Sequence, residues 1–96
     1  MTTFALPADI RIHEVAGLKL ALPDPRGTSG AVHLDASAVT DIDLAGVQLL
    51  LAWSRAVRSG GSHVRLERPS SVVVDALRLL GLGPEFGLAR TTGEAA

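Results

Sequence analysis

The chain has 96 residues, of which 47% are hydrophobic, and a formal net charge of −1. A chain of this length supports one hydrophobic core, because two cores would each be too small to be stable without disulfides or metals. We therefore expect a single domain over residues 1–96, with a core from about residue 4 to residue 82. The sequence contains no cysteine, which excludes disulfides, thiolate catalysis and cysteine-based zinc sites and agrees with a cytoplasmic location.

The charge balance and the composition argue against two further classes of protein. Nine basic residues against ten acidic ones leave little of the positive charge on which nucleic-acid binding depends. The three aromatic residues offer few surfaces on which bases could stack. No stretch approaches the roughly 18 apolar residues of a membrane-spanning helix. We expect a protein that neither binds nucleic acid nor inserts into a membrane.

The first third of the chain predicts a strand followed by a short helix. Residues 1–3 are expected to be loose, and residues 9–12 to form a strand. The following segment is predicted to be helical up to Pro23, since apolar residues recur there with helical spacing, namely at Val15, Leu18 and Leu22. Residues 24–30 contain many turn formers and no apolar residue, which is typical of a solvated connection.

The middle of the chain predicts a strand at 31–36 and then the longest helix. Asp43 stands where an N-cap acceptor belongs, so the helix is expected from about residue 45 to residue 59, before Gly60 and Gly61. Gly46 lowers helix propensity in the first turn, and close backbone packing is the simplest reason for its presence.

Leu49 and Trp53 lie one turn apart on this helix and leave two interpretations open. They predict either an exposed apolar edge, through which a homodimer could form, or side chains that fill the core against a neighbouring helix.

The last third predicts a strand at 63–67 and a helix after Pro69. Strict alternation in the strand places one of its faces in water, as in an edge or near-edge strand. Gly81 is expected to end the helix. Beyond Leu82, only Phe86 and Leu88 are expected to dock, and residues 89–96 are expected to be loose. The helix is expected to bury a row formed by Val73, Leu77 and Leu80.

Strands and helices alternate along the whole chain, with connections long enough for crossovers between parallel strands. The sequence therefore predicts an α/β fold with a small sheet covered by helices.

Few residues point to catalysis or to a cofactor. Asp35, Asp41 and Asp43 form the one dense carboxylate group, and such oxygens could hold Mg²⁺. Aspartate is common in turns and N-caps, however, and no lysine lies in this segment, so structural roles are favoured. The three histidines lack ligand spacing, and no glycine-rich phosphate loop is present. We expect no catalysis, no cofactor and no metal.

The segment LDASAVTDIDLAGVQLLL, from Leu34 to Leu51, resembles the core signature of STAS domains, the anti-sigma-factor antagonist family. The strand HVRLE and the ALRLLGL run ending at Leu82 agree with it, so the resemblance extends from about Ile12 onward. The first strand region and first helix look shorter than in a typical member. The resemblance implies a small mixed, mostly parallel β-sheet with helices packed mainly on one face, no catalysis, and binding of a protein partner such as a serine kinase that is also an anti-sigma factor.

In many family members a serine or threonine directly after the motif aspartate is phosphorylated as a switch. Here the aspartate is Asp43 and the switch position is Leu44, which has no hydroxyl, so we expect constitutive binding. Thr40 and Ser37 are weaker alternative acceptors. The partner surface that the resemblance implies consists of Asp41, Asp43, Leu44, Ala45 and Gln48.

Two alternatives stay open. Similar stand-alone members act as scaffolds beside chemotaxis genes or as small cytoplasmic subunits of lipid-transporting ABC systems. A small-ligand or nucleotide-sensing domain is a second alternative, because backbone donors at a helix N-terminus suit anions.

Overall fold

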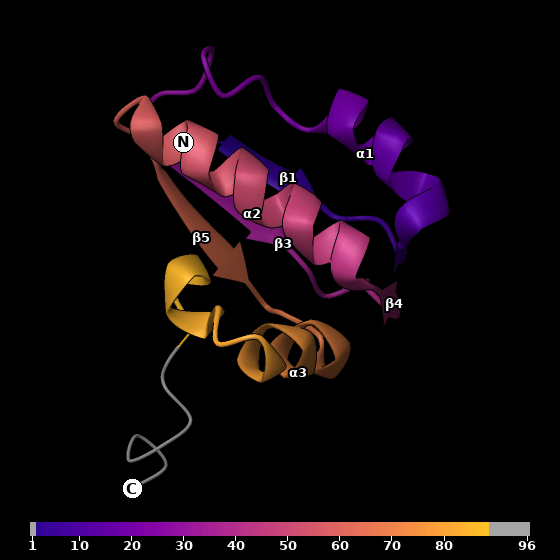
Figure 1. The fold of residues 1–96 in the computed structure, drawn as a ribbon. Helices are drawn as coiled ribbons and strands as arrows, with labels where there is room; N and C mark the ends of the chain where they lie inside the picture. The colour runs from indigo at the N-terminus through magenta and orange to yellow at the C-terminus, as the bar shows by residue number, and fades with distance from the viewer. Residues whose placement is uncertain (1, 89–96) are drawn as a thin grey trace, which may run out of the picture.

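The structure, a computed structural model, describes residues 2–88. Three strands form one sheet in the order β1-β3-β5, and two short strands, β2 and β4, form another (Figure 1). Every ladder in the described part of the chain is parallel. The strand bounds are β1 (Thr2–Ala5), β2 (Asp9–Ile10), β3 (Ala31–Asp35), β4 (Asp41–Ile42) and β5 (His63–Glu67).

The helices lie mainly on one face of the larger sheet. In Figure 1, α2 runs across this face and α1 runs alongside α2, while α3 lies below the ends of the strands. Within residues 2–88, no helix combines the length and the apolar character needed to cross a membrane. The helices are α1 (Val15–Ala21), α2 (Leu44–Ser59) and α3 (Ser71–Leu79), and the 3₁₀ turns are η1 (Ile12–Glu14) and η2 (Gly83–Phe86).

The strand register explains why one face of the sheet is covered. Val32 pairs with Val64, and Leu34 pairs with Leu66, and all four side chains are buried. Because side chains alternate along a strand, His33 and its partner Arg65 lie on the opposite face, where they are half-buried and exposed respectively. The predicted α/β class, with a mostly parallel sheet and helices mainly on one face, is confirmed.

Two predictions for the first 12 residues are wrong. Thr2 and Thr3 are not loose, because they pair in register with Val32 and His33. The strand predicted at 9–12 ends at Ile10. The Ile12 N–H donates to Asp43, so a side chain far along the chain turns the backbone out of the extended conformation.

At the other end of the chain, Phe86 is fully buried and Leu88 packs against the core, as predicted. Val73 and Leu77 of α3 are also buried, but Leu80 is 44% exposed, so the predicted row is wrong at this residue. The helix ends at Leu79, and Gly81 adopts a positive φ of 71°. The chain therefore leaves the helical path before Leu80 can face the core. The prediction for residues 89–96 lies outside the described residues.

Candidate functional site

The first turn of α2 is pressed directly onto strand β2. A Cβ atom at Gly46 would lie 2.0 Å from the carbonyl oxygen of Ile10 and 2.9 Å from its Cγ2. No side chain fits at that separation, so only glycine allows the helix to begin at this place. The prediction of close backbone packing at Gly46 is confirmed.

Asp43 caps α2, as the sequence predicts, and also joins it to η1. Its Oδ2 accepts the Ile12 N–H at 2.9 Å, and its Oδ1 accepts the Gly46 N–H at 3.1 Å. The hydrogen bonds from Ile12 and then from Gly46 hold the pKa of Asp43 below its ordinary value, because both stabilise the ionised carboxylate. Both oxygens of Asp43 are thus engaged within the fold.

Leu44 follows this cap and is 57% exposed. Ile12, whose backbone is held by the same carboxylate, is 65% exposed. Two apolar side chains therefore flank Asp43 at the surface. Exposed leucine and isoleucine are not unusual singly; here the hydrogen bond from the Ile12 N–H to Asp43 holds the two residues on neighbouring segments.

Of the charged residues around this site, Asp9 forms ion pairs, whereas Asp41 does not within the described residues. Arg11 makes a two-pronged contact with Asp9, with Nε 3.0 Å from Oδ1 and Nη2 2.9 Å from Oδ2. This contact lowers the pKa of Asp9 well below its ordinary value. The His13 Nε2 lies 3.2 Å from the same carboxylate. Asp41 accepts the Thr40 hydroxyl at 3.1 Å and forms no ion pair within residues 2–88.

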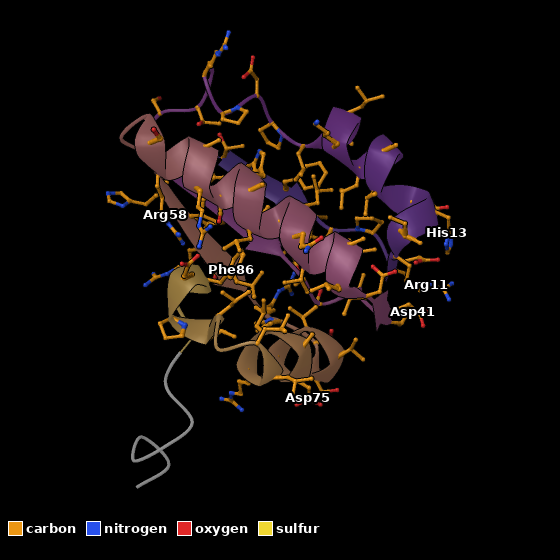
Figure 2. All side chains as sticks on the ribbon, viewed as in Figure 1. Arg11, His13, Asp41, Arg58, Asp75 and Phe86 are labelled. Atoms are coloured by element: carbon orange, nitrogen blue, oxygen red, sulfur yellow. The ribbon has the colours of Figure 1, made fainter. Side chains whose placement is uncertain are left out.

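Figure 2 shows Arg11, His13 and Asp41 at one end of the molecule, beside the start of α2. Of the other predicted surface residues, Gln48 is exposed and Ala45 is half-buried. The structure thus brings the predicted residues together around the first turn of α2.

Asp35 does not belong to this group. Its Oδ1 accepts the N–H and hydroxyl of Ser37 at 3.0 and 2.7 Å, and Arg68 contacts its other oxygen. The bonds from Ser37, followed by the contact with Arg68, lower the pKa of Asp35 to about 2. Within residues 2–88, no three acidic or histidine side chains are placed to hold a metal ion.

Sequence reasoning missed the contribution of η1 to the site. Ile12 was predicted to belong to a strand, and its N–H instead bonds to a residue 31 positions later. In the sequence, the alternation of Asp9, Arg11 and His13 indicates that these polar side chains lie together. It does not predict that Asp43 contacts this segment.

Fold and site together define a small α/β domain with an exposed apolar residue, Leu44, at the start of α2. The family model described as "Mlab, STAS domain" matches residues 6–88. The chain belongs to the STAS domain family. Membership supports a regulatory or interaction module as the general kind of protein. The match also begins before Ile12 and includes the first helix. No curated protein matches the chain.

Proposed function

We propose that this protein is a non-enzymatic regulatory module that acts in the cytoplasm, in the manner of an anti-sigma-factor antagonist, by binding a protein partner. The binding surface consists of Asp41, Leu44, Ala45 and Gln48, with Ile12 added from η1, and we call it the Leu44 surface. The observation that carries the proposal is the 57% exposure of Leu44, an apolar side chain on a rigidly capped helix start. Asp43, also predicted to contact the partner, accepts the N–H groups of Ile12 and Gly46 and so holds the surface in shape.

The chemistry of the Leu44 surface favours constitutive binding. A phosphate at this position would add nearly two negative charges beside Asp43 and Asp41, whereas leucine keeps the position permanently apolar. The Asp41 carboxylate accepts the Thr40 hydroxyl, forms no ion pair with the described residues, and lies beside the start of α2 (Figure 2). A complementary partner therefore offers an apolar pocket for Leu44 and a basic side chain for Asp41.

Ser37 and Thr40 are poor replacements for the missing switch residue. The Ser37 hydroxyl donates to Asp35 at 2.7 Å, so a phosphate there would be repelled by that carboxylate. The Thr40 hydroxyl lies 3.1 Å from Asp41 and 3.3 Å from the Ala8 carbonyl oxygen, and a phosphate would replace both contacts with repulsion. We therefore propose that binding is not controlled by phosphorylation in this loop.

The anion-sensing alternative has less support. The position that a bound phosphate would take at the start of α2 is held by the Asp43 carboxylate, which accepts the Gly46 N–H. A second anion would meet that negative charge, so we do not extend the proposal to nucleotides.

Direct binding to purified candidates tests the proposal. The three classes of candidate are a serine kinase that is also an anti-sigma factor, a chemotaxis component and an ABC-transporter subunit, chosen from genes next to the one encoding this chain. Leu44→Glu is expected to weaken binding of the true partner by roughly tenfold or more, as for a central apolar contact.

Leu79→Glu is the matched control, because Leu79 is 87% exposed on another helix and takes the same change without touching the Leu44 surface. Its affinity is expected to equal that of the wild type. Equal binding by wild type and Leu44→Glu would contradict the proposed surface. If Leu44→Ser became phosphorylated and kept full affinity, constitutive binding through an apolar contact would be wrong.

A further inference from the structure

A second apolar feature lies between α1 and α2. Residues of α1, of the connection after it and of one side of α2 line a groove of about 460 Å³. In Figure 1, the connection passes beside α2 after leaving α1. The walls of this α1–α2 groove are mostly apolar and include Leu22, Pro23, Pro25, Leu49, Ala52 and Trp53.

The predicted edge formed by Leu49 and Trp53 proves to be the floor of this groove. Trp53 is only 7% exposed, and its Nε1–H donates to the Pro23 carbonyl oxygen at 2.8 Å. Leu49 packs against the core. Of the two interpretations of this pair, burial against a neighbouring helix is confirmed for Trp53, and no protruding tryptophan is available for dimerisation.

Leu20 projects from the lip of the groove. It lines the groove and yet is 89% exposed, more than any other large hydrophobic side chain among residues 2–88. An exposed apolar side chain, Leu20, thus lies beside an apolar groove. This is the arrangement needed for an isologous contact, in which each copy inserts the same residue into the other.

The groove also carries one charged residue of each sign, as a two-fold contact between copies requires for opposite charges to meet. The groove is lined by one lysine, Lys19, and one aspartate, Asp24. In a two-fold contact, a residue pair that meets once meets a second time with the copies exchanged. Lys19 of each copy can therefore face Asp24 of the other, giving two opposite-charge pairs.

The same features fit a small ligand less well. The indole N–H at the base of the groove is already bonded to Pro23, so it cannot orient a polar ligand. The opposite charges of Lys19 and Asp24 favour neither an anionic nor a cationic head group. A binding pocket normally places a few free polar groups within apolar walls.

From these observations we propose that the α1–α2 groove is the interface of a homodimer. Leu20 of each copy enters the groove of the other, and Lys19 pairs with Asp24 across the two-fold axis. The contact is small, so the dimer forms at micromolar or higher concentration. None of the residues that line the groove belongs to the Leu44 surface.

Sedimentation equilibrium of the full chain tests the interface. The wild type is expected to show a monomer–dimer equilibrium, and Leu20→Glu to be monomeric at every concentration. Because Leu20 is almost fully exposed, the melting temperature of the variant should equal that of the wild type at low concentration. Leu79→Glu, an equally exposed change on α3, should dimerise normally. A wild type that stays monomeric, or a dimer that persists in Leu20→Glu, would overturn the proposal.

A charge exchange tests the orientation of the two copies. Lys19→Asp alone and Asp24→Lys alone each place like charges opposite one another, so each should dimerise more weakly than the wild type. An equimolar mixture of the two variants brings opposite charges together in both pairs and should form a heterodimer about tenfold more tightly than either variant pairs with itself.

The doubly changed chain, Lys19→Asp with Asp24→Lys, has the pairs reversed and should dimerise like the wild type. Asp24 also accepts the Arg26 N–H at 2.9 Å, so melting temperatures of all variants verify that the turn is intact. A mixture of two folded variants that associates no better than each alone would refute the two-fold pairing. Partner binding through Leu44 is measured separately, so failure of one proposal leaves the other standing.

Discussion

Leu44 and Gly46 lie two residues apart in α2 and carry opposite constraints. Leu44 is more than half exposed, whereas Gly46 has no space for any side chain. Asp43 precedes both residues, and its two carboxylate oxygens accept the N–H groups of Ile12 and Gly46. At the scale of residues, Asp43 and Gly46 therefore fix the start of α2, and Leu44 is the side chain exposed there.

Gly46→Ala should destabilise the protein by about 3 kcal/mol, since the new Cβ would overlap the Ile10 carbonyl oxygen and force the helix away. Gly17→Ala is the matched control, because a Cβ at Gly17 meets nothing within 4 Å. It should stabilise α1 by about 0.5–1 kcal/mol through its better helix propensity. Urea unfolding of both variants measures the two free energies. A Gly46→Ala variant as stable as the wild type would contradict the close contact.

Asp43→Ala should destabilise the protein at neutral pH, as loss of an N-cap does. The pKa of Asp43 is depressed in the folded protein, so its contribution is fully present above the unfolded pKa near 3.9 and is lost as the pH falls through the lower folded value. The stability difference between wild type and variant should therefore shrink progressively below about pH 4.

Urea unfolding at several pH values measures this difference. Asp43→Asn, which keeps one acceptor oxygen but does not titrate, should lose less stability than Asp43→Ala at neutral pH and should also approach the wild type in acid. A difference that stays constant between pH 7 and pH 3 would show that the ionised form is not specifically stabilised.

At the scale of elements, α2 organises the molecule because it contacts β4, β5, η1 and α1. One side of it closes the core with Val47, Leu50 and Val57. Its first turn displays Leu44, and another side forms part of the α1–α2 groove. The 3₁₀ turn η2 contacts β5 and α3 and so completes the core.

Phe86→Ala should lower the free energy of unfolding by about 3–5 kcal/mol, because Phe86 is completely buried and its removal leaves a large cavity. Leu79→Ala on the neighbouring helix should change it by less than about 0.5 kcal/mol, since Leu79 is 87% exposed. Thermal and urea unfolding compare the two. A small effect of Phe86→Ala would mean that η2 adds little to the core.

At the scale of the whole molecule, the two proposed surfaces share no residue, although both draw on α2. A dimer formed through the α1–α2 groove carries two Leu44 surfaces, one from each copy. Such a dimer can bind two partner molecules at once when these are held close together.

This arrangement has a measurable consequence for dissociation rates. On a sensor densely coated with the partner, the wild-type dimer should dissociate at least about tenfold more slowly than Leu20→Glu, because rebinding within the pair is intramolecular. On a sparsely coated sensor the two proteins should dissociate at the same rate. Equal rates at both densities would contradict a dimer that keeps both Leu44 surfaces accessible.

The sequence by itself determined that strands and helices combine in one α/β fold, that Asp43 caps α2 and that Gly46 allows close packing. The strict alternation of one strand with one helix was wrong, because β2 follows β1 and β4 follows β3 without a helix between them. The fold class and the cap depend on local periodicity and on the preferences of single residues at helix ends, which neighbours in the chain reveal. The attention given to Leu44 came instead from the resemblance to STAS domains.

Only the tertiary structure decided that Ile12 joins the site, that Trp53 is buried and that Leu20 stands at the lip of a groove. Each of these depends on contacts between residues far apart in the chain, such as the bond from Ile12 to Asp43 and the bond from Trp53 to Pro23. Local patterns do not encode which segments meet, because packing of the complete core selects those contacts and can override local preference.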